Sequence, residues 1–242
     1  MIKMLASVNE VSEALLVQKE GVDILDLKNP HKGALGALNM NLVNEIVVAV
    51  NGVTTISSTI GDMAFKASLI KTPVEEMILA GVDIVKIGVF SPLLEIQKAE
   101  HELLKQFGSN GTRIVLVLFA EHYQADFDLK RLAETGVYGV MIDTINKTNG
   151  SLLDKLSMPI LNDFVQEAKS LGLHTGLAGS LKLGNFSPLM SLEPDYLGFR
   201  GGICSKENRR EKISAEAVRE IRNRIQEQSV DLHTSKTAIN ML

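Results

Sequence analysis

An eightfold alternation of short apolar runs with segments of helical periodicity is the feature that most constrains this fold. The runs lie at 2–8, 22–28, 54–60, 82–89, 113–120, 137–144, 174–180 and 196–203. In the segments between them apolar residues recur three and four positions apart, as in Val74, Met77 and Ile78. Strand followed by helix, repeated eight times, predicts parallel strands joined by helical crossovers. Runs that are apolar along their whole length are typical of a sheet covered on both faces.

The length of 242 residues suits an α/β barrel, because this architecture uses about 250 residues as one unit. A weak internal repeat supports a recurring strand unit, since GVDILDLK at 21–28 is similar to GVDIVKIG at 81–88. A doubly wound open sheet is the alternative, but the first run ends in ASVN with no G-x-G-x-x-G turn. We therefore predict a single-domain (β/α)8 TIM barrel over 1–228, followed by a loosely ordered tail over 229–242.

Composition excludes several classes of function. The chain has 25 Lys+Arg against 29 Asp+Glu, a net charge of −4, so it lacks the basic surplus that nucleic-acid binding requires. Its apolar runs are far shorter than the roughly 20 residues of a membrane span. We expect a cytoplasmic protein, because the N-terminus shows no signal peptide and a single cysteine, Cys204, cannot form an intrachain disulfide. The five histidines show no ligand spacing, so no metal site is expected.

Charged residues at the ends of predicted strands mark the candidate site, because barrel enzymes do chemistry at the carboxyl ends of their strands. Asp26 and Lys28 are two apart and share strand parity with Val22 and Ile24, so all four are expected to face the barrel interior. Lys86 is placed in the same way, and Asp143 and Arg200 occupy later strands. Close ammonium groups lower one pKa and create a neutral amine nucleophile. A buried layer of ion pairs without a catalytic task is the alternative.

Glycines at the ends of the last two strands indicate a phosphate site. Gly179 and Ser180 end the seventh run, and Gly201 and Gly202 end the eighth. Loops at these two positions commonly bind phosphate through backbone N–H groups in barrels, although the glycines could also serve only as tight turns. The charged run at 208–212 is expected to be a solvated approach to the last helix. Asp23 and Asp83 begin their strands and are expected to be structural.

One element carries a specific resemblance. The pattern D-x-K-N-P-x-x-G-x-L-G-A at 26–37 resembles the signature of the (5-formylfuran-3-yl)methyl phosphate synthase family. The similarity continues through STIGD at 58–62, VKIG at 85–88, MIDT at 141–144, AGS at 178–180 and RG at 200–201, and spans residues 1 to about 225. The segments after Asp62 and after Glu121 depart from the family's pattern, which affects the expected loop contacts with substrate.

The resemblance implies a (β/α)8 fold and a reaction of methanofuran biosynthesis. Two molecules of glyceraldehyde 3-phosphate would give 4-(hydroxymethyl)-2-furancarboxaldehyde phosphate, phosphate and water, without cofactor or metal, in a formal carbon–oxygen lyase reaction. The family's Schiff-base lysine falls on Lys28 and its proton-transferring lysine on Lys86. Its acidic residues fall on Asp26 and Asp143, and its third lysine on Lys147.

Two other functions fit the same residues. A class I aldolase or sugar-phosphate isomerase would share the barrel, the lysine and the phosphate site, but would form no furan. A non-catalytic barrel that binds a phosphate ligand would explain the glycines and leave Lys28 and Lys86 without a role. In each case the expected partner is a small sugar phosphate, and the chain is expected to form a homo-oligomer.

Overall fold

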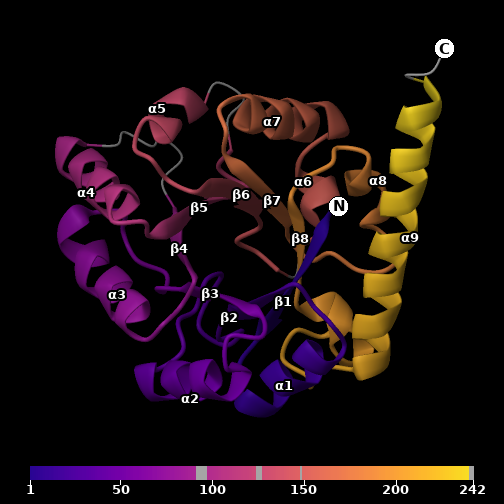
Figure 1. The fold of residues 1–242 in the computed structure, drawn as a ribbon, viewed down its shortest axis with the longest axis horizontal. Helices are drawn as coiled ribbons and strands as arrows, with labels where there is room; N and C mark the ends of the chain where they lie inside the picture. Colours follow the sequence, from indigo (N-terminus) through magenta and orange to yellow (C-terminus); the bar gives the residue numbers. More distant parts are fainter. Residues whose placement is uncertain (91–96, 124–126, 148, 240–242) are drawn as a thin grey trace.

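The computed structural model is a closed barrel of eight parallel strands surrounded by helices (Figure 1), as the alternating pattern predicts. It describes residues 1–90, 97–123, 127–147 and 149–239. Within these ranges no helix is both long enough and apolar enough to cross a membrane. The strands are β1 (Lys3–Val8), β2 (Ile24–Leu27), β3 (Thr55–Thr59), β4 (Ile84–Val89), β5 (Arg113–Phe119), β6 (Gly139–Asp143), β7 (His174–Ala178) and β8 (Tyr196–Phe199).

The strands follow one another around the barrel in chain order, and β8 pairs with β1 to close it, with Lys3 opposite Tyr196. All eight expected strands are present. The β-branched and aliphatic residues that fill them pack well on a pleated surface that is covered on both sides. Because every strand is parallel, all the carboxyl ends meet at one mouth of the barrel, where the candidate residues were expected.

The crossovers place a layer of helices around the strands (Figure 1). The helices are α1 (Val11–Lys19), α2 (Met40–Val50), α3 (Ala67–Leu79), α4 (Lys98–Ser109), α5 (Leu129–Ala133), α6 (Leu152–Lys155), α7 (Met158–Ser170), α8 (Ser187–Met190) and α9 (Ala215–Ile239). Helix α9 continues through 229–239, where the sequence pattern predicts a loose tail. No glycine or proline interrupts it, so nothing local ends the helix. Residues 240–242 of that tail lie outside the described ranges.

Apolar side chains form two cores, one on each side of the sheet. The larger core lies between strands and helices, and the smaller fills the barrel with residues such as Leu5, Ile24 and Ile84. Ile24 therefore faces inward as its parity predicts. Val22 belongs to the outer core, contrary to expectation, because it precedes β2 and is outside the strand's alternation.

Carboxylates at the amino-terminal end of the barrel accept hydrogen bonds from the second N–H group of a neighbouring strand. Asp23 accepts a hydrogen bond from Met4 N at 2.8 Å, and Asp83 accepts one from Ile56 N at 2.8 Å. Asp195 accepts from Thr175 N at 2.7 Å in the same way. The repeated Gly-Val-Asp segments thus stabilise the barrel at the end opposite the candidate site, in keeping with the structural role expected for Asp23 and Asp83.

Candidate active site

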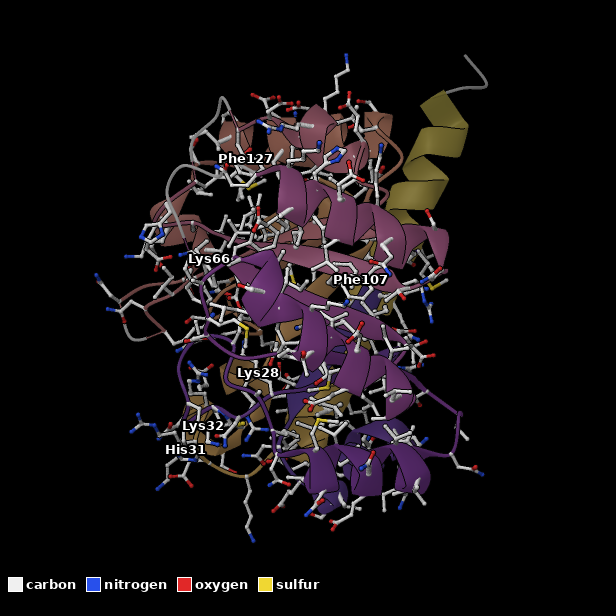
Figure 2. All side chains as sticks on the ribbon, turned by 90° about the vertical axis from the view of Figure 1, so that its left-hand side faces the viewer. Lys28, His31, Lys32, Lys66, Phe107 and Phe127 are labelled. Carbon is white, nitrogen blue, oxygen red and sulfur yellow. The ribbon has the colours of Figure 1, made fainter. Side chains whose placement is uncertain are left out.

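A cavity of about 280 Å³ lies at the carboxyl ends of the strands. Its walls include every residue that the sequence placed in the site: Asp26, Lys28, Lys86, Asp143, Lys147, Gly179, Ser180, Gly201 and Gly202. Figure 2 shows Lys28 within the barrel, with His31 and Lys32 farther out on the loop that follows β2. The barrel closure therefore brings together candidates from five strands and the loops that follow them.

Asp26 and Lys86 form a buried ion pair between β2 and β4. Lys86 Nζ lies 2.5 Å from Asp26 Oδ1, and the two residues are 2% and 1% exposed. The same carboxylate accepts hydrogen bonds from Ser7 Oγ at 2.8 Å and from Ser57 Oγ at 2.9 Å. Because these bonds satisfy both carboxylate oxygens, Asp26 is held rigidly in one orientation.

Asp143, at the end of β6, binds two lysines at once. Its Oδ2 lies 3.4 Å from Lys28 Nζ, and its Oδ1 contacts Lys147 Nζ. Thr144 N donates to Oδ1 at 2.8 Å. Lys147 Nζ also lies 3.4 Å from Thr144 Oγ1, so this residue of the polar loop after β6 is a partly buried member of the site.

The three lysines and two carboxylates carry an excess of one positive charge when every group is ionised, so loss of one proton makes the cluster neutral. Burial lowers the pKa of Lys86, although the attraction of Asp26 opposes this change. Burial also lowers the pKa of Lys147 to about 7, against the opposing effect of Asp143. Burial alone would raise the pKa of Asp143, but the ammonium groups of Lys147 and Lys28 outweigh it and hold that pKa below its usual range. The site can therefore hold a neutral amine near pH 7.

The glycine-rich strand ends form a neighbouring wall of the cavity. Gly179 and Ser180 have φ values of 120° and 49°, in the left-handed region that allows a sharp turn after β7. A Cβ at Gly179 would lie 2.8 Å from Thr144 Cγ2, so glycine is required there for close packing. A Cβ at Gly202 would lie 2.4 Å from the carbonyl oxygen of Leu181. Tight packing therefore accounts for these two glycines independently of any phosphate.

Arg200 lines the cavity, but its guanidinium is occupied by protein partners. It forms a buried ion pair with Glu13 at 2.5 Å and donates from Nη1 to the Ser7 carbonyl at 3.1 Å. Its Nε donates to the carbonyl of Arg209 at 2.9 Å. Glu13, in the first turn of α1, is a supporting residue that sequence reasoning missed, since a carboxylate on an amphipathic helix ordinarily faces solvent.

The segment 208–212 is for the most part the solvated approach to the last helix that the sequence predicts, since Asn208, Arg210, Glu211 and Lys212 are exposed and Arg209 is half-buried. Asn208 and Arg209 line the cavity, and so does Lys182, which pairs with Glu207 at 2.7 Å. The local sequence does not distinguish Arg209 from its neighbours in this charged run, because the contacts that hold Arg209 at the cavity come from distant elements. Among the residues that the structure describes, no group of three or more His, Cys, Asp or Glu side chains is arranged to hold a metal ion.

Comparisons with known proteins identify a family and a shared fold. A family model described as 4-HFC-P synthase matches residues 4–222. A Methylorubrum extorquens protein, to which the name (5-formylfuran-3-yl)methyl phosphate synthase is provisionally assigned, is 37% identical over 89% of this chain and 88% of its own. The Methanococcus maripaludis C6 protein of that name is 30% identical over 90% of this chain and 97% of its own. Phosphoribosyl anthranilate isomerase from Thermotoga maritima shares the fold, with a TM-score of 0.67 at 11% identity over 93% of this chain and 99% of its own.

Proposed function

This chain belongs to the 4-HFC-P synthase family, and from that membership we propose that it condenses two molecules of glyceraldehyde 3-phosphate into 4-(hydroxymethyl)-2-furancarboxaldehyde phosphate, with release of phosphate and water. It is therefore an enzyme of methanofuran biosynthesis, formally a carbon–oxygen lyase acting on phosphates. The observation that carries the proposal is the buried cluster of three lysines and two aspartates in one cavity, because condensation through a Schiff base requires both an amine nucleophile and proton carriers beside it.

Lys28 is the proposed nucleophile. One glyceraldehyde 3-phosphate, isomerised to its ketone form by proton transfer between its first two carbons, would condense with the neutral amine of Lys28 and lose water, which gives an iminium ion. Loss of a proton from the adjacent carbon would give an enamine, and the enamine would attack the aldehyde of the second triose phosphate. Ring closure, cleavage of the carbon–nitrogen bond to regenerate the amine of Lys28, dehydration and loss of one phosphate would complete the furan. Asp143, 3.4 Å from Lys28 Nζ, would stabilise the positive iminium nitrogen.

Lys147 and Lys86 are the proposed proton carriers. Lys147 shares Asp143 with Lys28 and has a pKa of about 7, so near neutral pH it can accept the proton that Lys28 must lose. Lys86 is anchored by Asp26 on β2, and its lowered pKa suits it to exchange protons with the carbon skeleton. Gly179, Ser180, Gly201 and Gly202 would hold one phosphate through backbone N–H groups.

The test joins product analysis with trapping of the covalent intermediate. The purified protein is incubated with glyceraldehyde 3-phosphate, and the furfural chromophore is followed by absorbance, since an aldolase or isomerase would form none. Borohydride is then added, and we expect a triose-derived mass on the peptide that contains Lys28, but none with Lys28→Ala. Labelling of Lys86 or Lys147 in place of Lys28 would contradict the assignment of the nucleophile while leaving the reaction intact.

A further inference from the structure

We propose that Arg209 binds the phosphoryl group of one of the two triose phosphates, at the side of the cavity between β8 and β2. This inference rests on the proposed function, because the reaction brings two phosphorylated molecules into one cavity and the glycine-rich strand ends serve only one of them. A phosphate monoester carries a charge of about −1.5 to −2 near pH 7, so the second phosphoryl group also needs a cationic partner.

Arg209 differs from the other cations of the cavity wall in that no carboxylate of the described residues lies within ion-pair distance of it, although Asp143 and Asp62 attract it from farther away. Lys28 and Lys147 contact Asp143, Lys86 contacts Asp26, Lys182 contacts Glu207 and Arg200 contacts Glu13. The side chain of Arg209 makes one hydrogen bond, from Nη2 to the carbonyl of Gly33 at 3.2 Å. Most of its five N–H donors are therefore available, and the guanidinium fork matches a phosphate in geometry.

The backbone around Arg209 is held in place by contacts on both sides of its loop. Cys204 and Ile213 pair as an antiparallel bridge at the base, and Ser205 N donates to the carbonyl of Lys212 at 2.9 Å. The guanidinium of Arg200 donates hydrogen bonds to the carbonyls of Arg209 and Glu211 at 2.9 and 3.4 Å. The buried ion pair with Glu13 fixes Arg200 in turn, so the loop presents Arg209 to the cavity as a preorganised group.

The position of Arg209 spans the mouth from the glycine cluster to the loop after β2. A Cβ at Gly201 would lie 3.8 Å from the backbone nitrogen of Arg209, whereas its guanidinium reaches Gly33, five residues beyond Lys28. Arg209 lines the same cavity as Asp143 and Lys147, and its charge interacts with both. The residue is half-buried, so solvent screens its attraction for a bound anion less than it would at a fully exposed site.

The experiment compares Arg209→Gln and Arg209→Lys with Arg210→Gln. Arg210 is a matched control because it is the adjacent arginine, is exposed and does not line the cavity. Rates of furan formation are measured against glyceraldehyde 3-phosphate concentration, with and without inorganic phosphate as inhibitor. Melting curves of all variants establish that each is folded.

In Arg209→Gln we expect the half-saturating substrate concentration to rise about 10- to 100-fold, as for loss of a hydrogen-bonded charged contact. Inhibition by inorganic phosphate should weaken by a similar factor, a change that a merely structural role would not produce. Arg209→Lys should give values between those of the wild type and Arg209→Gln, since lysine keeps the charge but not the planar pair of donors. Arg210→Gln should match the wild type.

Two outcomes would overturn the inference. One is an unchanged half-saturating concentration and unchanged phosphate inhibition in folded Arg209→Gln. The other is a shift confined to the pH profile, which would make Arg209 only a modulator of Lys147. Absence of furan from the wild-type protein would instead refute the proposed reaction, and calorimetric titration with inorganic phosphate would still report on Arg209, with weaker binding expected in Arg209→Gln and equal binding counting against it.

Discussion

Replacing Asp143 by Asn separates its charge from its shape, because the amide keeps the size and one carbonyl oxygen of the carboxylate. Asp143 is 3% exposed and binds Lys28 and Lys147 together. Loss of one partner of a buried ion pair costs about 3–5 kcal/mol when the other charge stays buried and unpaired. An amide cannot accept a proton or balance an iminium ion, so turnover should also fall on the order of 10²-fold or more.

The stability loss should depend on pH through Lys147. The pKa of Lys147 is about 7 in the folded protein against an ordinary value of 10.5, so the unfolded chain binds more protons between these values and stability rises with pH. Asp143→Asn removes the attraction and the hydrogen bond that raise the pKa of Lys147, so this pKa falls further in the variant. Each unit of that fall costs about 1.4 kcal/mol of stability at pH values below the lowered pKa. Asp143 itself, with a lowered pKa, stays ionised throughout this range and adds no slope.

Chemical denaturation at pH 6 and pH 9 measures both contributions. We expect a loss of about 3–5 kcal/mol at pH 6 and a loss smaller by up to about 1.4 kcal/mol at pH 9, where Lys147 is neutral in either folded protein, because pH 6 lies about one unit below the pKa of Lys147. Asp23→Asn is the control, because Asp23 lies at the opposite end of the barrel and should alter stability without altering turnover. Equal losses at the two pH values would refute the electrostatic reasoning, and a folded fraction with full activity would refute the catalytic role.

Three further predictions concern the surroundings of the site. Gly201→Ala should be tolerated, since its Cβ meets nothing nearer than the Glu207 carbonyl at 3.4 Å, whereas Gly201→Val should raise the half-saturating substrate concentration without unfolding the protein; identical saturation curves would argue against a phosphate site there. Glu13→Gln should cost about 3–5 kcal/mol in denaturation experiments by leaving the buried Arg200 unpaired, and a loss under about 1 kcal/mol would contradict this. Cys204 should react slowly with thiol reagents at pH 8, because burial raises its pKa to about 11; rapid labelling of the folded protein would be inconsistent with that environment.

Local patterns in the sequence were sufficient to predict the barrel and much of the site. Eight apolar runs separated by helical periods predict the eight strands, because side-chain periodicity depends only on neighbouring residues. The two-residue spacing of Asp26 and Lys28, and the position of Lys86 within its run, predict that they reach one mouth of a parallel barrel. The resemblance to a known family then identified Lys147, which an isolated reading of its polar loop would leave in solvent.

Tertiary structure alone decided which of these groups act together. Lys28 and Asp143 are 115 residues apart and meet only because the strands close into a barrel. Arg209 belongs to a charged run that is indistinguishable from a solvated segment until Arg200, Glu13 and the bridge at Cys204 turn it toward the cavity. Periodicity reports the environment of a residue along its own element, but charge pairing and preorganisation depend on contacts between elements, and those contacts exist only in the folded chain.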